Sequence, residues 1–195
     1  MKIRTAVKND KEALFRLWSE AFGDGDGVIE HFFDTVIEYE NTVVAEIDGE
    51  AVSALYLIPA DILHENKLYS AYYVYAAATL KSFRKRGIMA KLLEFADSLA
   101  EQRSIDYLFL HPAEENLYAY YAKNGYETAF YEKEDKFDGD LVKWSEEIIE
   151  LDRWLGEGES DENGFDNNSR KTGMIKRINA DAPIIDNAYL GITLE

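Results

Sequence analysis

Basic residues are scarce in this chain, and four of them stand together just before a glycine. Lys81, Arg84, Lys85 and Arg86 fall within six positions, and Gly87 opens a stretch with helical periodicity. The first turn of a helix exposes unpaired N–H groups and the positive end of the helix dipole. A glycine there has no Cβ, so an anion can approach the backbone closely. The segment therefore predicts a site for a phosphate or a pyrophosphate.

The same pattern also fits an ordinary strand-to-helix turn whose basic side chains are solvated. Short phosphate motifs often match by chance, so the spacing alone leaves both interpretations open. Two other phosphate-binding motifs are absent from the sequence, which holds neither GxGxxG after a strand nor GxxxxGK[ST]. Nicotinamide dinucleotides and nucleoside triphosphates are therefore poorly supported as ligands.

Two segments resemble a known family. The sequence RKRGIM (residues 84–89) resembles the [QR]-x-x-G-x-[GA] signature of the GCN5-related N-acetyltransferases (GNAT), whose turn amides bind the pyrophosphate of acetyl-CoA. Downstream, YAKNGY (residues 121–126) resembles the family's YEKLGF helix end. The resemblance extends over residues 1–131. The sequence of residues 76–93 and 110–126 most resembles that of a bacterial branch that includes the enhanced-intracellular-survival-type acetyltransferases.

The resemblance implies an acetyl-CoA-dependent N-acetyltransferase in which an amine attacks the thioester directly. The strand before the turn would hold the pantetheine arm and offer an N–H to the developing oxyanion. No metal is implied, and acetyl-CoA enters as a co-substrate. The coenzyme-binding residues that the resemblance assigns are Ala77, Ala78, Thr79, Arg84, Lys85, Arg86, Gly87, Ile88 and Met89.

The resemblance also assigns proton transfer to a tyrosine. A phenol with a pKa of about 10 stays protonated at neutral pH, so Tyr121 can protonate the departing thiolate. The alternative for Tyr121 is packing on an apolar helix face, which is the role expected of Tyr118 and Tyr120. An ammonium acceptor must lose a proton before it attacks. The acceptor of that proton is left open among Glu46, Asp61, Glu65 and the terminal carboxylate of Glu195, which some members of the resembled branch use.

Two positions depart from the family pattern. Met89 fills the last position of the signature, where small residues are usual. Glu114 stands seven residues before Tyr121, where relatives often have Asn. Any contact that this Asn makes in relatives is therefore not expected here.

The elements that must position these residues follow from the spacing of apolar residues. Helices are predicted at residues 11–22, 29–37 and 87–103 and from Pro112 to 124. Strands are predicted at residues 42–47, 51–58, 105–110 and 126–131, and Asp48-Gly49-Glu50 predicts a hairpin between the first two. The expected fold class is α/β (α+β), with a GNAT-like mixed, mostly antiparallel central sheet, helices on both faces and a C-terminal strand addition.

Composition changes along the chain predict its domain organisation. Residues 1–135 are expected to form the acetyltransferase core. Residues 136–172 are expected to hold a helix, at residues 144–155, and a flexible acidic loop. Residues 173–195 are predicted to be C-terminal strands added to the core. The sequence leaves open whether these strands pair within the chain or with a partner, as in a homodimer.

Composition also limits the functional class. Hydrophobic residues make up 47% of the chain, enough for a sizeable core. There is no long apolar run, no apolar leader and no cysteine, which together favour a cytoplasmic protein. The formal net charge of −17 disfavours nucleic acid and anionic lipid as partners. That negative charge increases solubility, and it also favours cationic amine substrates.

Two other functions stay open. The first is a coenzyme A-binding sensor or interaction module that has the same fold but does not turn over. The second is an unrelated α/β domain that binds another anion. The three histidines, His31, His64 and His111, neither cluster nor follow a metal-binding spacing, so they are expected to be structural or solvated.

Overall fold

The computed structural model describes residues 1–131, 140–156, 171–186 and 188–190 of the chain. Its contacts divide the chain into two compact units, and each unit is built from two stretches of sequence. The first unit comprises Met1–Ile58 and Tyr73–Ser104. The second unit comprises Pro59–Tyr72 and Ile105–Glu195.

The strands of the first unit follow the order β1-β2-β3-β4. β1 (Lys2–Thr5) and β3 (Glu50–His64) both pair antiparallel with β2 (Thr42–Ile47). β4 (Lys67–Thr79) follows β3 in the sheet. The first unit contains β3 as far as Ile58 and β4 from Tyr73 onward, so the end of β4 that was predicted to bind the coenzyme belongs to it.

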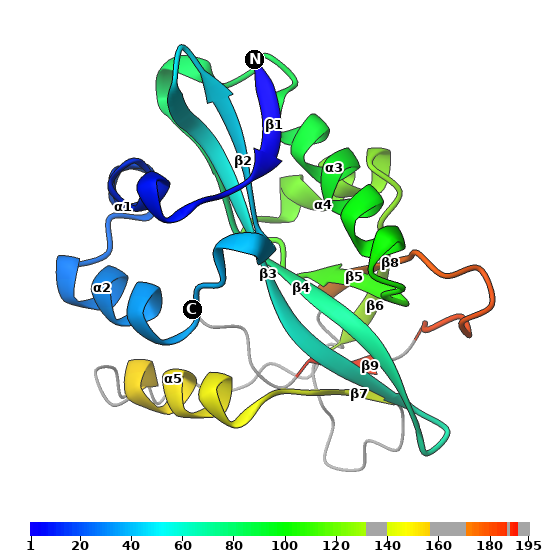
Figure 1. Ribbon diagram of the computed structural model, residues 1–195. Coiled ribbons are helices and arrows are strands. Elements are labelled where there is room, and N and C mark those ends of the chain that lie inside the picture. The colour runs from blue at the N-terminus through cyan, green and yellow to red at the C-terminus, as the bar shows by residue number, and fades with distance from the viewer. Residues whose placement is uncertain (132–139, 157–170, 187, 191–195) are drawn as a thin grey trace. The chain divides into compact units, whose positions relative to one another are not determined.

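Helices cover both faces of these strands. The first unit contains α1 (Lys11–Phe22), α2 (Asp26–Thr35) and α3 (Ile88–Gln102). Figure 1 shows α1 and α2 on one side of the strands and α3 on the other. Two single-turn 3-10 helices, η1 (Lys8–Asp10) and η2 (Tyr39–Asn41), lie in the connections of this unit.

An aromatic layer joins α1 and α2 to the sheet. The ring of Trp18, 3% exposed, lies 4.7 Å from that of Phe32, 5.4 Å from that of Tyr56 and 5.8 Å from that of Tyr75. Burying one large apolar side chain is worth about 1.5–3 kcal/mol. The layer therefore fixes the face of β3 and β4 that α1 and α2 cover.

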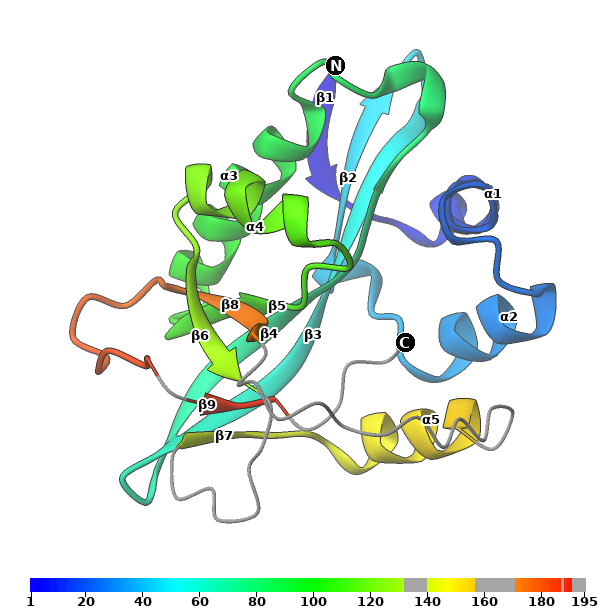
Figure 2. The same ribbon diagram turned by 180° about the vertical axis from the view of Figure 1, so that it is seen from behind.

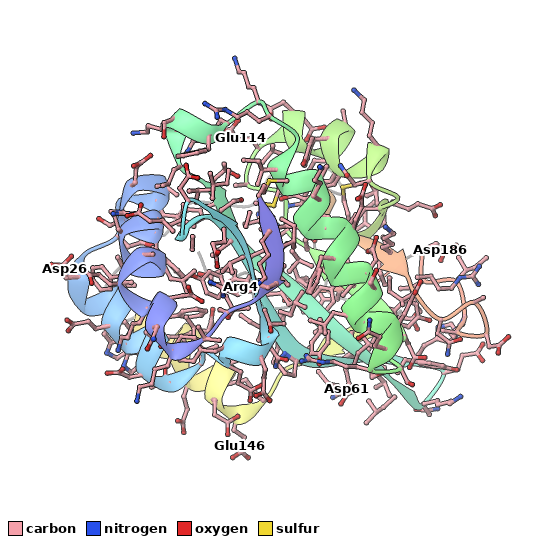
Figure 3. The ribbon with its side chains drawn as sticks, turned by 45° about the horizontal axis from the view of Figure 1, so that its top comes forward. Arg4, Asp26, Asp61, Glu114, Glu146 and Asp186 are labelled. Atoms are coloured by element: carbon pink, nitrogen blue, oxygen red, sulfur yellow. The ribbon has the colours of Figure 1, made fainter. Side chains whose placement is uncertain are left out.

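An ion-pair network anchors the N-terminal strand of the first unit. Arg4, which is labelled on β1 in Figure 3, donates to Asp10 at 2.7 and 2.9 Å and to Glu46 at 2.8 Å. Asp10 also accepts the Val7 N–H at 2.8 Å. The guanidinium group lowers the pKa of Asp10 from its ordinary value of 3.8. The network ties β1, β2 and the start of α1 together.

In the second unit, a strand from late in the sequence lies inside the sheet. Their order is β4-β5-β8-β6-β9-β7, and β7 also pairs with β3. β8, orange in Figure 2, lies between β5 and β6 and is antiparallel to both. β9 pairs in parallel with β6 and β7. The bounds of these strands are β5 (Tyr107–Leu110), β6 (Glu127–Tyr131), β7 (Asp140–Lys143), β8 (Lys171–Arg177) and β9 (Ala188–Tyr189).

The second unit also contains two helices and an aromatic core. The helices are α4 (Glu115–Lys123) and α5 (Glu146–Gly156). The ring of Phe109 lies 5.6 Å from that of Phe130 and 5.6 Å from that of Trp144. Trp144 in turn donates its indole N–H to the carbonyl oxygen of Leu190 at 2.8 Å. These contacts join β5, β6 and the chain on either side of α5.

Several predicted elements are confirmed with little change. The helix at residues 11–22 and the strand at residues 42–47 have the predicted bounds, and the hairpin between β2 and β3 turns at Asp48 and Gly49. The helix predicted at residues 144–155 is α5. Residues 157–169 of the predicted acidic loop lie outside the described residues, and the predicted domain boundaries stay a prediction.

One strand is longer than predicted. β3 does not end at residue 58 but continues to His64. Its pairing with β2 ends at Tyr56, and its pairing with β7 begins at Asp61. Pro59, which has no N–H to donate, lies between these two ladders. The proline therefore interrupts neither of them, and the strand continues through it.

One helix starts later than predicted. α4 begins at Glu115 and not at Pro112, because Glu114 has an extended backbone with φ −138° and ψ 147°. Glu115 then stands in the first turn, where an acidic residue interacts favourably with the helix dipole. In the described parts of the chain, no helix has both the length and the apolar character needed to cross a bilayer.

Candidate functional site

A left-handed residue interrupts β4 near its end. Ala76 has φ 45°, although the strand continues to Thr79. A left-handed conformation costs an L-residue about 1–2 kcal/mol, so the surrounding structure must hold it in place. The regular alternation of the strand is therefore broken just before Ala77 and Ala78, two of the residues predicted to bind the coenzyme.

Residues of β3 hold the end of β4. Ser53 is fully buried, donates its hydroxyl to the carbonyl oxygen of Ala78 at 2.8 Å and lies 2.7 Å from the hydroxyl of Thr79. One residue further on, the Leu80 N–H donates to the carbonyl oxygen of Val52 at 3.0 Å. These bonds fix the backbone where the chain leaves the sheet.

The turn that follows has the geometry of an anion-binding site. It runs from η3 (Lys81–Phe83) to α3 and contains two left-handed residues, Lys85 with φ 62° and Gly87 with φ 72°. Turns of this kind point successive N–H groups toward one side, where an anion can bind. The N-cap residue of α3 is Gly87, which has no side chain to cap the first turn, and no described atom beyond its chain neighbours and the helix backbone lies within 4 Å of where a Cβ on it would stand. The space beside Gly87 is therefore open.

The basic side chains of the turn have different surroundings. Arg84 donates its Nε to the carbonyl oxygen of Thr79 at 2.9 Å, and Arg86 donates to that of Ser82 at 2.8 Å. Lys85 is exposed. All three charges stay beside the turn, but both guanidinium groups use part of their donor capacity on the protein backbone. The Arg84 bond also joins the end of β4 to the turn.

The first residues of α3 anchor the helix that carries the amides. Ile88 is 4% exposed and Met89 is half-buried. Their side chains are thus largely removed from solvent, while their backbone N–H groups lie in the uncapped first turn. The structure therefore brings all the residues predicted for coenzyme binding together within the first unit.

Tyr121, the predicted proton donor, belongs to the second unit. It lies in α4, is 9% exposed and contacts the rings of Tyr120 at 5.4 Å and Tyr126 at 5.8 Å. Burial raises the pKa of Tyr121 to about 12. The hydroxyl therefore stays protonated throughout the neutral range. Glu114, the departure from the family pattern, is the exposed residue just before α4 and accepts a hydrogen bond from Asn116 at 2.8 Å.

The candidate proton acceptors lie in different parts of the chain. Glu46 is in the first unit and is bound to Arg4. Asp61 lies in the second unit on β3, opposite Lys143 of β7. Glu65 is exposed in the turn between β3 and β4. Glu195 lies outside the described residues.

The described histidines do not form a metal site. His64 is within 2.8 Å of Asp140, and His111 bonds through Nδ1 to the carbonyl oxygen of Thr172. Over the residues that the structure describes, there is no group of three or more side chains that could hold a metal ion.

Two features of the site were missed by the sequence interpretation. Ser53 is the only serine or threonine in the apolar run AVSALYLI, residues 51–58, and that isolation was a usable signal. The left-handed Ala76 had no signal, because alanine shows no preference for that conformation.

The first comparison with known proteins concerns the sequence. A family model described as an acetyltransferase (GNAT) domain matches residues 2–129. Among curated proteins, none matches the sequence.

Solved structures give the second comparison. YhbS, a GNAT family N-acetyltransferase from Escherichia coli in complex with CoA, matches with a TM-score of 0.63 and 13% identity, over 97% of this chain and 88% of that one. A GNAT family acetyltransferase from Brucella melitensis in complex with acetyl-CoA matches with a TM-score of 0.54 and 18% identity, over 75% of this chain and 97% of that one.

A third structure is longer than this chain. Eis1 from Mycobacterium abscessus matches with a TM-score of 0.58 and 18% identity, over 67% of this chain. The chain spans about a third of the length of Eis1 and of three other matching structures, a probable N-acyltransferase from Enterococcus faecalis and GCN5-related N-acetyltransferases from Anabaena variabilis and Kribbella flavida. At these identities the likeness establishes the fold, a mixed α/β sheet with mostly antiparallel strands and helices.

Proposed function

Because this chain belongs to the acetyltransferase (GNAT) domain family, we propose that it transfers an acetyl group from acetyl-CoA to an amine. The observation that carries the proposal is the uncapped, left-handed turn at Lys85 and Gly87, bonded through Arg84 to the end of β4. Such a turn binds a diphosphate through backbone amides. Two solved structures of the same fold are complexes with CoA or acetyl-CoA, which also supports acetyl-CoA as the donor.

In the proposed reaction, the amine nitrogen attacks the thioester carbonyl carbon. A carbon–nitrogen bond forms, the carbon–sulfur bond breaks, and the sulfur leaves as a thiolate that takes up a proton. The amide groups of Ala77, Ala78 and Thr79 are proposed to bind the pantetheine arm and to donate to the developing oxyanion. Removing one oxyanion donor from an enzyme typically lowers kcat by about 10²–10³. The break at Ala76 supports this role, because strained backbone is often found at functional sites.

Tyr121 is proposed as the group that protonates the leaving sulfur. Its pKa, raised to about 12 by burial, keeps the proton on the phenol at neutral pH. A thiol with an ordinary pKa of about 8.5 is a stronger acid than this phenol, so the phenol donates its proton uphill to the thiolate. Basicity develops on sulfur as the carbon–sulfur bond breaks, so the proton moves late in that step, and the phenolate then takes a proton back from water.

The proton acceptor for the amine is proposed to be one of the four carboxylates. Glu46 is bound to Arg4, an arrangement typical of a structural ion pair. Glu65 and Asp61 remain candidates, and so does the terminal carboxylate of Glu195, a group that some members of the resembled branch use. The side-chain carboxylates are replaced by their amides and the terminal carboxylate by a C-terminal amide, and kcat/KM against pH then identifies the base, because only its loss removes the acidic limb of the profile.

The finer affiliation is part of the same proposal. The sequence of residues 76–93 and 110–126 supports membership of the bacterial branch that resembles enhanced-intracellular-survival-type acetyltransferases. The composition supports a cytoplasmic enzyme. The acceptor is proposed to be a small amine, an aminoglycoside-like cation or a peptide amine. The strongly negative net charge favours the cationic members of that set.

The test has a binding step and a turnover step. Calorimetry with acetyl-CoA is expected to give a heat of association for the wild type and none for Gly87→Glu, whose carboxylate would block and repel the diphosphate. Gly87→Ala is the control, because it adds the same left-handed strain without the charge. It is expected to retain binding.

Free-thiol release from acetyl-CoA in the presence of an amine panel then measures turnover. Release with at least one amine is expected. Binding without release would favour a non-catalytic coenzyme A sensor, for which the exposed Glu114 in place of Asn is the supporting feature. No binding at millimolar acetyl-CoA would refute the proposal as a whole.

A further inference from the structure

Ser53 is a buried polar residue on an otherwise apolar stretch of β3. Its side chain is inaccessible to solvent, as are those of Ala54 and Leu55 beside it. A buried hydroxyl is unfavourable unless its hydrogen bonds are made. The two bonds of Ser53, to Ala78 and Thr79, are therefore what allows a serine at this position.

The donors in this small network can be assigned. A carbonyl oxygen only accepts, so the single hydroxyl proton of Ser53 is on the bond to Ala78 O, at 2.8 Å. The 2.7 Å contact between the two hydroxyls then requires that Thr79 donate to Ser53. The relay runs from Thr79 through Ser53 to the carbonyl of Ala78. It fixes the side-chain rotamer of Thr79. The hydroxyl oxygen of Thr79 can still accept a hydrogen bond from another group.

Thr79 is also held through its backbone. Its carbonyl oxygen accepts the Nε–H of Arg84 at 2.9 Å. Ser53 therefore holds the side chain and Arg84 holds the carbonyl of the same residue. All three residues belong to the first unit, so these contacts lie within one compact part of the chain.

We infer that Ser53 is a positioning residue for acetyl-CoA, acting through Thr79 and the Ala78 carbonyl. The inference rests on the proposed function. The left-handed Ala76 leaves the end of β4 without regular strand geometry, and Ser53 fixes the orientation of the peptide groups that follow it. Ser53 itself is buried and does not touch the substrate. Its contribution is to hold the binding amides and carbonyls in place before the substrate arrives.

The test compares acetyl-CoA binding by calorimetry in Ser53→Ala, Thr79→Val and the double variant. Each single change removes the hydroxyl relay, and each is expected to weaken binding about tenfold. The double variant is expected to bind no more weakly than Ser53→Ala, because that single variant already loses the bond between the two hydroxyls that Thr79→Val removes. Thr79→Ser keeps the donor and is expected to weaken binding less than Thr79→Val does.

Thr42→Val is the matched control for stability. Thr42 is also a buried hydroxyl of the first unit, 1% exposed, and it donates to the carbonyl oxygen of Glu38 at 3.0 Å. It lies in β2, outside the residues assigned to the site. It is expected to lower the midpoint of thermal unfolding as much as Ser53→Ala and to leave the Kd of acetyl-CoA unchanged.

Two results would overturn the inference separately from the proposed function. The first is a wild type that binds acetyl-CoA while Ser53→Ala and Thr79→Val bind it equally well. The second is additive weakening in the double variant, which would mean that the two hydroxyls act independently. A wild type that does not bind acetyl-CoA would instead refute the proposed function, and the inference with it.

Discussion

At the residue scale, the turn before α3 shows how one side chain type can serve two purposes. Arg84 and Arg86 bring positive charge to a protein whose net charge is −17, and both also donate to backbone carbonyls of the same segment. Arginine can do this because its guanidinium group has five donors in a fixed plane. Each guanidinium group thus keeps other N–H donors for an anion, beside the amides of the turn and the Lys85 ammonium.

Tyr121→Phe is expected to lower kcat by about 10²–10³ if the phenol is a general acid. The Kd of acetyl-CoA is expected to stay within twofold, because the ring and its packing against Tyr120 and Tyr126 are kept. Steady-state kinetics and calorimetry on the same preparation measure the two effects. Tyr120→Phe is the control, since it removes the neighbouring hydroxyl and is expected to keep turnover. Equal turnover in both variants would remove Tyr121 from the mechanism.

Asp10→Asn is expected to lower the free energy of unfolding at pH 7 by about 1–2 kcal/mol, because it weakens charged hydrogen bonds that are mostly removed from solvent. The pKa of Asp10 is lowered in the folded state, so its contribution is present above the ordinary value of 3.8 and is lost as pH falls through the folded value. Urea unfolding from pH 7 to pH 3 should therefore show the two proteins converging.

The control for this prediction is an exposed ion pair. Lys11 and Asp34 are 3.1 Å apart with side chains 44% and 69% exposed. Asp34→Asn is expected to change stability little at any pH, since exposed pairs contribute little. A stability difference between wild type and Asp10→Asn that stays constant down to pH 3 would contradict the assigned role of the carboxylate.

At the scale of elements, left-handed residues mark the places where the first unit changes direction. Ala76 breaks β4, Lys85 and Gly87 shape the turn before α3, and Asp48 and Gly49 close the β2–β3 hairpin. The hairpin turn has φ 54° and 87°, the geometry that matches the twist of paired strands. Glycine relieves the strain at two of these places, and at Ala76 the surrounding contacts must supply the difference.

Gly49→Ala is expected to destabilise the protein by about 1 kcal/mol through left-handed strain alone. No described atom lies within 4 Å of where its Cβ would stand, so the cost is conformational and not steric. Gly27→Ala is the matched change in α2, equally open but without a left-handed φ. It is expected to stabilise by up to about 1 kcal/mol, because alanine favours a helix. Chemical unfolding should give opposite signs, and equal signs would refute the assignment of the turn.

At the scale of the whole molecule, the dominant property is charge. With 38 acidic and 21 basic residues, the protein creates a negative potential that attracts cations and repels anions. For a dicationic amine acceptor, kcat/KM is expected to fall several-fold between about 20 and about 300 mM KCl, since salt screens this attraction. A zwitterionic amino acid is the control and is expected to show little change. A flat salt dependence for the dication would show that net charge serves solubility alone.

Much of the local structure was predictable from the sequence. The helix at Lys11–Phe22 and the strand at Thr42–Ile47 follow from the spacing of apolar residues, and the Asp48-Gly49 turn follows from the residues that tolerate a positive φ. The turn that is proposed to bind an anion could be located for the same reason, because helix start, glycine and basic residues are neighbours in the chain. Its side-chain contacts were not, since nothing in the spacing directs Arg84 toward Thr79.

The sequence by itself determined the elements whose hydrogen bonds and turns close over a few residues: α1, the β2–β3 hairpin and the start of α3. Only the tertiary structure decided that β8 lies between β5 and β6, that β3 continues through Pro59, and that Ser53 holds the end of β4. The physical reason is separation along the chain. Strand order and the partner of a buried hydroxyl depend on which distant segments meet, and local periodicity carries no information about that choice.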